Sequence, residues 1–178
     1  MTLELLQPDF RAKVEELLSR LATQGIRMVP YCTQRTPWEQ ARLWRQSRSS
    51  AQIAVTTQRL RQQGAPRIAR CIDEVGAQHG KPVTNAAPGY SHHQYGNAVD
   101  CFLVNRDGDA DWDASAAGYI AYARVAKELG LRAGRDWGDS PHVQFYHHEP
   151  HHDHTPAQLE VMLCERYPAF AALAGKGT

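Results

Sequence analysis

The sequence predicts an α+β domain in which a small antiparallel sheet packs against helices. Several segments place hydrophobic residues at helical spacing behind helix-capping residues, whereas others alternate apolar and polar residues with the period of a strand. The chain has 178 residues, 42% of them hydrophobic, which is enough for a single domain over residues 1–178. The expected helices are 8–23, 37–45, one ending near 129 and 156–166, and the expected strands are 26–32, 96–103 and 143–146.

The first expected helix starts at Pro8 and ends before Gly25, the usual positions of proline and glycine around a helix. A short strand follows over 26–32. Thr36-Pro37-Trp38-Glu39 is then a capping box with proline in the first helical position, which predicts a helix through about Arg45. The hydrophobic stripe of the first helix consists of Phe10, Val14, Leu17, Leu18 and Leu21.

The helices in the rest of the chain differ in how clearly the sequence indicates their ends. Residues 47–80 are rich in Arg and Gln and indicate one or two helices of uncertain ends. Asp113 or Ser115 is expected to cap a helix that runs to about Leu129. A second capping box at Thr155 predicts the final helix, at about 156–166.

The segment 96–103 is the best-defined strand. Ala98, Asp100 and Phe102 alternate with Val99, Cys101 and Leu103, so the two sets face opposite sides of a sheet. In the second strand, His142 and Gln144 share one side. If the two strands are antiparallel neighbours, Asp100 and His142 lie together although they are far apart in the sequence.

Four residues have the chemistry of a hydrolytic zinc site. A catalytic zinc ion takes three nitrogen or oxygen ligands from the protein and leaves one position for water, and His93, Asp100 and His142 form such a set. Asp139 remains to act as the base. Mononuclear iron oxygenases also use two histidines and a carboxylate, but with tighter local spacing and no need for Asp139. The zinc hydrolase interpretation is therefore favoured.

The fixed positions of this pattern are Ser91-x-His93-x-x-Gly96-x-Ala98-x-Asp100, followed by Asp139-x-x-His142. The pattern resembles the zinc peptidases of the D-alanyl-D-alanine carboxypeptidase and L-alanyl-D-glutamate endopeptidase family, which also contains phage endolysins and vancomycin-resistance dipeptidases. The segment from Arg35 through Gln40 to Leu43-Trp44 is similar to the Arg-Ser-x-x-x-Gln-x-x-Leu segment of that family. The resemblance covers about 29–145 and implies a hedgehog/D,D-peptidase-like fold.

The chain departs from the family pattern in three places. Thr36-Pro37 stands where serine is common after the arginine, and the loop that leads through 136–139 to the last histidine is short. Asp139 replaces the glutamate of many members. Its side chain is one methylene shorter, so the loop must lie closer to the metal.

The resemblance implies a zinc metallopeptidase that cleaves the stem peptide of peptidoglycan. An endolysin-like L-alanyl-D-glutamate endopeptidase is preferred because the chain is short and shows no signal sequence, and a D-alanyl-D-alanine carboxypeptidase or dipeptidase is the alternative. The implied roles are zinc ligation by His93, Asp100 and His142, general base and acid for Asp139, oxyanion stabilisation by Arg35, and substrate binding by Ser91 and Gln40.

Each of these roles has a structural alternative. Asp139 would cap the turn before Pro141, Arg35 would pair with a surface carboxylate, and Ser91 would hold its loop. His92 is expected to point away from the metal. A protein of another class, a non-catalytic zinc-stabilised cell-wall or phage-structural binding module, would keep the fold. Such a module needs neither Asp139 nor Arg35, so catalysis is favoured.

The charge and hydropathy of the chain argue against nucleic acid and membranes as partners. The net charge of +1 gives no basic surface for nucleic acid or an anionic membrane. No apolar run approaches the roughly 20 residues that span a bilayer, and Met1-Thr2-Leu3-Glu4 lacks the features of a secretory signal. We expect a protein that is cytoplasmic at synthesis, reaches the stem peptide after holin-dependent release, and is a monomer.

Three remaining groups receive structural interpretations. Widely separated cysteines without a CxxC pair indicate reduced core residues rather than a disulfide framework. The histidine-rich segment 147–154 is interpreted as a solvated loop interrupted by Pro150. The alternating acids of 107–113 do not have the glycine and terminal glutamate at the spacing of a calcium loop and indicate a polar turn. The cysteines are Cys32, Cys71, Cys101 and Cys164.

Overall fold

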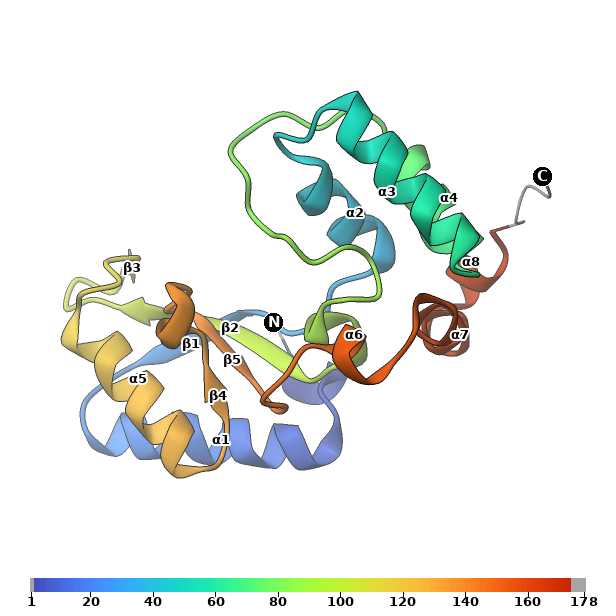
Figure 1. Cartoon of the computed structure of the whole chain (residues 1–178). Coiled ribbons are helices and arrows are strands. Elements are labelled where there is room, and N and C mark those ends of the chain that lie inside the picture. The colour runs from blue at the N-terminus through green and yellow to red at the C-terminus, as the bar shows by residue number, and fades with distance from the viewer. Residues whose placement is uncertain (1, 174–178) are drawn as a thin grey trace. The chain divides into compact units, whose positions relative to one another are not determined.

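The computed structural model describes residues 2–173, which form two compact units (Figure 1). The first unit contains the chain up to Gln34 and the segment Tyr95–His147, and the second contains Arg35–Gln94 and the chain from His148 onward. The first unit holds an antiparallel sheet with helices, and the second is helical. The expected α+β class with a small antiparallel sheet is confirmed.

The sheet of the first unit has five strands in the order β1-β2-β5-β4, with β3 paired to β2. Every pair is antiparallel. The central strand β2 therefore lies between β1 and β5, which places residues from distant parts of the sequence side by side. The strands are β1 Met28–Cys32, β2 Ala98–Val104, β3 Ala110–Asp111, β4 Arg132–Ala133 and β5 His142–Gln144.

Two helices cover one face of this sheet, α1 Pro8–Thr23 and α5 Ala117–Glu128 (Figure 1). The residues of β2 that face them, Val99 and Cys101, are buried in one hydrophobic core with residues of both helices. Full burial of a large apolar side chain stabilises a fold by about 1.5–3 kcal/mol. The core thus holds β2 firmly and leaves its alternate residues, Asp100 among them, on the other face.

Two helices of the second unit begin with the capping boxes that the sequence predicts. Thr36 and Glu39 form the capping box of α2, and Thr155 and Gln158 form that of α7. The N-cap of α4, Ala65, makes no side-chain hydrogen bond. The helices of the second unit are α2 Pro37–Arg45, α3 Ser50–Gln62, α4 Pro66–Glu74, α6 Pro150–Asp153, α7 Pro156–Arg166 and α8 Pro168–Ala171. Short 3₁₀ helices are η1 Leu3–Leu5 and η3 Gly134–Trp137 in the first unit and η2 His92–Tyr95 at the boundary between the units.

Three expectations about the elements were wrong. The N-cap of α5 is Ala116, because the Asp113 carboxylate instead accepts hydrogen bonds from the backbone and hydroxyl of Ser115 and closes a turn before the helix. Strand β5 starts at His142 and ends at Gln144, before Phe145 and Tyr146. In the histidine-rich segment, Pro150 starts the short helix α6 instead of interrupting a loop, since proline suits the first turn of a helix.

Candidate metal centre

Asp100 and His142 are direct partners across β2 and β5. The Nδ1 atom of His142 lies 2.9 Å from Oδ1 of Asp100, and both side chains are largely buried. The predicted antiparallel pairing of these two strands is therefore confirmed. It brings a histidine and a carboxylate into hydrogen-bond contact on the sheet face away from α1 and α5.

The second ring nitrogen of His142 also faces an oxygen. Its Nε2 lies 3.0 Å from Oε1 of Gln144, and the amide of Gln144 is oriented by donating to the Tyr146 carbonyl. Burial favours a neutral ring, but the hydrogen bond that the ring donates to Asp100 and the negative charges of Asp100 and Asp139 outweigh it and raise the pKa of His142. The ring is thus held in one orientation by acceptors at both nitrogens.

Asp139 lies in the tight loop between η3 and β5. Its backbone N–H donates to the Gly134 carbonyl at 2.9 Å, and its own carbonyl accepts from the backbone of His142 at 3.1 Å. Asp139 is exposed, and its charge acts on His142. The loop therefore fixes a carboxylate near the Asp100–His142 pair while leaving it open to solvent.

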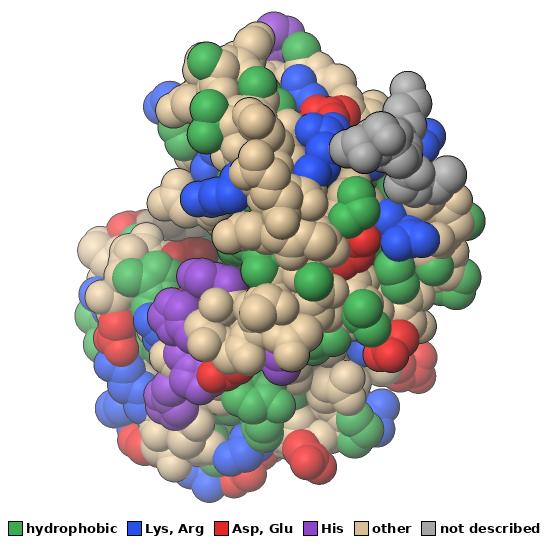
Figure 2. Space-filling view, turned by 45° about the vertical axis from the view of Figure 1, so that its right-hand side comes forward, with side chains coloured by type: hydrophobic (Ala, Val, Ile, Leu, Met, Phe, Trp, Pro, Cys, Tyr) green, Lys and Arg blue, Asp and Glu red, His purple; other side chains and the backbone are tan. Residues whose placement is uncertain are grey.

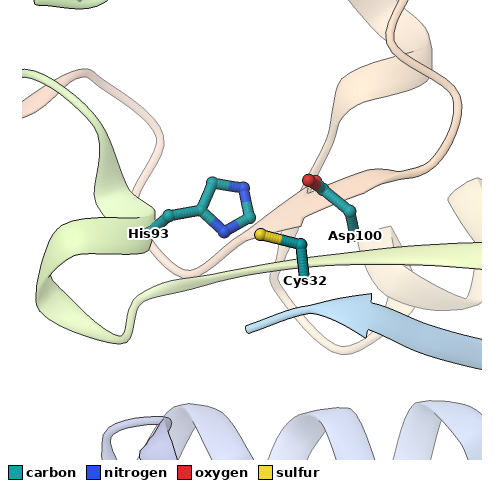
Figure 3. Close-up of side chains that lie close together, drawn as sticks. All are labelled: Cys32, His93 and Asp100. Carbon is teal, nitrogen blue, oxygen red and sulfur yellow. The ribbon is translucent and has the colours of Figure 1, made fainter. Parts of the chain in front are cut away.

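His93 is carried by η2, five residues after Pro88 and shortly before β2. Its side chain is buried, with 2% of its surface exposed. A turn at Gly96, where φ is +71°, joins η2 to β2 and so couples His93 to Asp100 through a short stretch of chain. His93, Asp100 and Cys32 each offer one ligand atom, and these atoms lie within 4.8 Å of one another (Figure 3).

Cys32 is the member of this group that the sequence did not indicate. Figure 3 shows its sulfur between the ring of His93 and the carboxylate of Asp100. Cys71 and Cys101 are buried as expected, but Cys32 is only partly buried, and so is Cys164. The sequence signal was weak because Cys32 belongs to no short metal-binding motif, and its place beside Asp100 depends on strand pairing.

The donor set suits zinc. Two ligand atoms at about 2.0–2.2 Å from a tetrahedral zinc ion are about 3.3–3.6 Å apart, so Nδ1 of His142 and Oδ1 of Asp100, at 2.9 Å, need to separate only slightly to share one ion. Imidazole nitrogen, carboxylate oxygen and thiolate sulfur are all common zinc ligands. His142, in contact with Asp100, adds a second imidazole at the same edge of this donor set.

Arg35 and Gln40 form a hydrogen-bonded pair in the second unit. The Arg35 guanidinium donates to Oε1 of Gln40 at 3.0 Å, and Nε2 of Gln40 donates to the Ala86 carbonyl at 2.7 Å. Gln40 is completely buried, so its side chain gives the Arg35 guanidinium a fixed hydrogen-bond acceptor. The backbone N–H of Arg35 also donates to the carbonyl of His93 at 3.3 Å, which ties this pair to the segment that carries His93.

Ser91 and His92 are both buried next to His93. The carbonyl of Ser91 accepts from the backbone of Gln94 and so shapes the start of η2. The Nε2 atom of His92 lies 2.7 Å from the carbonyl of His148, and this histidine does not belong to the group of candidate ligands.

The histidine-rich segment lies at the surface. Figure 2 shows histidine side chains gathered on one face. His151 stacks on Tyr90 with ring centroids 4.9 Å apart, and His148 pairs with Asp153 at 3.0 Å. These contacts are made in and around α6, so the segment is better described as a short exposed helix with its own packing than as a solvated loop.

Residues 3–130 match the family described as VanY: D-alanyl-D-alanine carboxypeptidase. The chain belongs to this family. The range matched to the VanY family contains His93 and Asp100 and ends before Asp139 and His142. Among residues 2–173, no helix of this VanY-family chain is both long and apolar enough to cross a membrane.

One curated relative is the peptidoglycan L-alanyl-D-glutamate endopeptidase CwlK of Bacillus subtilis (strain 168). The two sequences are 36% identical over 75 residues, which covers 36% of this chain and 45% of the relative. The match therefore spans less than half the length of that relative. The sequence-based resemblance to this group of peptidases is confirmed by the VanY-family match and this relative.

Proposed function

We propose that this chain is a zinc-dependent peptidoglycan hydrolase that cleaves the stem peptide between L-alanine and D-glutamate. The observation that carries the proposal is the contact between Asp100 and His142 across β2 and β5, with Asp139 in the adjoining loop. Membership of the VanY family and the name of the CwlK relative support a peptidase that acts on peptidoglycan.

His93, Asp100 and His142 are the proposed zinc ligands. A zinc ion held by them supplies Lewis-acid activation of water and of the scissile carbonyl. Asp100 and His142 are preorganised for this role by the sheet and by Gln144, since a ligand ring that is already oriented loses less freedom on binding metal.

Asp139 is the proposed general base. Its exposed carboxylate takes a proton from the attacking water and then delivers one to the leaving amine of the cleaved peptide bond. In the tight loop from Gly134 to His142, backbone hydrogen bonds hold Asp139 close to the proposed ligand His142. A non-catalytic binding module has no need of a solvent-open carboxylate held in this way.

Arg35 is the proposed partner of the oxyanion that forms on the scissile carbonyl. Removal of one such donor typically lowers the rate by about 10²–10³-fold. Buried Gln40 serves substrate binding indirectly by holding the guanidinium. Ser91 is proposed to position the substrate through the η2 segment that it starts.

A second candidate is a D-alanyl-D-alanine carboxypeptidase, which the name of the matched family favours. The two activities differ in the bond they break and therefore in their products. Disaccharide-linked stem peptides incubated with the zinc-loaded protein and analysed by mass spectrometry separate them. A released peptide that begins with D-glutamate identifies the endopeptidase, and loss of terminal D-alanine alone identifies the carboxypeptidase.

Two controls make this experiment decisive. A sample treated with a chelator tests the metal, and Asp139→Asn tests the base while leaving the size of the side chain unchanged. We expect the variant to bind zinc as the wild type does and to lose about 10²–10⁴-fold in rate. Failure of the zinc-loaded wild type to cleave any stem peptide would contradict the proposal and favour a binding module.

A further inference from the structure

We propose that the Cys32 thiolate is a fourth protein ligand of the metal and keeps the resting site closed to water. The inference rests on the proposed function for the identity of the metal. It starts from Cys32 and Asp100, which are paired across β1 and β2 of the first unit and lie beside each other in Figure 3.

The sheet aligns three of the donors in one row. Cys32 of β1 pairs with Asp100 of β2, and Asp100 pairs with His142 of β5. Directly paired residues on neighbouring strands point to the same face, with their Cβ atoms about 4.5–5.5 Å apart. Cys32 and His142 therefore flank Asp100 on the face opposite the hydrophobic core.

A β-bulge puts Cys32 in this row. Pro30 pairs with Cys101, but Cys32 pairs with Asp100, so β1 advances by two residues where β2 advances by one. Tyr31 is the additional residue. In regular pairing Tyr31 would lie opposite Asp100, and Cys32 would lie opposite core residue Val99. The bulge redirects the thiol to the ligand face, a common use of bulges beside active sites.

Four protein donors change what the site can do. Zinc sites with four protein ligands are closed, whereas hydrolytic sites keep one position for water. Thiolate binds zinc well, and on binding the Cys32 thiol releases its proton to solvent. With His93, Asp100 and His142, the Cys32 thiolate fills the position that a hydrolytic reaction needs, so the thiol must leave before catalysis.

Cobalt(II) substitution tests this ligand independently of activity. A thiolate bound to cobalt(II) gives a sulfur-to-metal charge-transfer band in the near ultraviolet, and nitrogen and oxygen ligands do not. We expect the band in the wild-type protein, its loss in Cys32→Ser, and its retention in Cys164→Ser, a matched change at another partly buried cysteine. Absence of the band from the wild type would overturn the proposal.

Alkylation provides a test that needs no variant. Iodoacetamide labelling followed by mass spectrometry of peptides should show Cys32 protected by zinc by at least about tenfold, with Cys164 as the internal reference. Equal labelling of Cys32 with and without zinc, in protein shown to contain the metal, would overturn the ligand assignment.

Cleavage of stem peptides tests the closure of the site. Zinc-loaded Cys32→Ala should cleave several-fold faster than the wild type, because one coordination position is open from the start. If Cys32→Ala cleaves no faster than the wild type although the wild type shows the cobalt band, the proposal that Cys32 closes the site would be overturned. If no protein cleaves but the band depends on Cys32, the proposed function fails and the ligand assignment stands. If the wild type cleaves stem peptides but shows no cobalt band, the proposed function stands and the ligand assignment fails.

Discussion

Gly134 lies directly against the backbone of Asp139. A Cβ atom at Gly134 would come within 2.3 Å of the Asp139 carbonyl oxygen and 2.7 Å of the His142 Cβ, so no side chain fits. We predict that Gly134→Ala pushes this loop away from β5 and lowers both stability and stem-peptide cleavage. Urea unfolding and the cleavage assay measure the two effects.

Gly108→Ala is the matched control. Gly108 has a φ of +92° and open space around its Cβ position, so alanine there carries backbone strain alone. We expect a loss of stability of about 1 kcal/mol with unchanged cleavage by the folded protein. Full activity in Gly134→Ala would show that the position of Asp139 is not critical.

Gln40 offers a test of how Arg35 is held. In Gln40→Ala the Ala86 carbonyl and the Arg35 guanidinium both lose a partly buried hydrogen bond. An unsatisfied polar group costs about 1–3 kcal/mol when fully buried, and we expect a drop of about 1 kcal/mol in unfolding free energy together with slower cleavage. Gln58→Ala, on the exposed side of α3, should change neither. A stable Gln40→Ala protein with wild-type activity would contradict the positioning role.

Glu160 of α7 takes over the capping of α4. Its buried carboxylate accepts from the backbone N–H groups of Arg67 and Ile68 at 2.7 and 2.9 Å. Because Ala65 makes no side-chain cap, Glu160→Ala leaves two N–H groups at a helix start without their acceptor. We predict a loss of about 1–3 kcal/mol in urea unfolding. Glu165→Ala in the same helix is the control and should cost far less.

Zinc should stabilise the folded protein because the ligands are brought together only by folding. At a free zinc concentration of 100 times Kd, the gain is about 2.7 kcal/mol, visible as a higher Tm that a chelator reverses. His142→Ala should lose most of this shift. His152→Ala, at the exposed histidine-rich segment, should retain it. A shift that instead depends on His152 would move the main metal site to the surface.

The buried cysteines give a pH prediction. Burial raises the pKa of the Cys71 thiol to about 12, with a further increase from the charge of Glu74. Burial likewise raises the pKa of Cys101 to about 12. Both thiols therefore stay protonated between pH 7 and pH 9, and we expect no increase in their alkylation over that interval in folded protein. Rapid labelling at pH 9 without unfolding would contradict this.

Much of the fold could be predicted because its signals are local. The helix Pro8–Thr23 starts and ends where proline, glycine and the hydrophobic stripe indicate, and both predicted capping boxes form. The two-residue strands β3 and β4 were missed, since such a short strand has no periodicity to detect. Their place is set by pairing with β2 and β5, which is a property of the folded sheet.

The contact between Asp100 and His142 could also be predicted, because the alternation of apolar and polar residues indicates the face of each residue and antiparallel pairing brings the two together. The place of Cys32 beside Asp100 could not be predicted. Regular pairing of β1 with β2 turns Cys32 toward the core, and nothing local in Pro30-Tyr31-Cys32 distinguishes a bulged strand from a regular one. The assignments of His93, Asp139, Arg35 and Ser91 remain predictions; Asp139→Asn tests that of Asp139, and Gln40→Ala tests that of Arg35 indirectly.

The bulge at Tyr31 makes the local form of β1 part of the chemistry of this sheet. If β1 kept Tyr31 but paired regularly, the thiol would turn to the opposite face while every ligand codon stayed the same; deleting Tyr31 would give regular pairing with the cysteine still opposite Asp100. The donor set can therefore be altered by a change in strand pairing as well as by a substitution. Among relatives of this chain, a cysteine one residue after the proline would face the same side as Cys32 without a bulge, whereas a cysteine at the spacing found here needs the bulge.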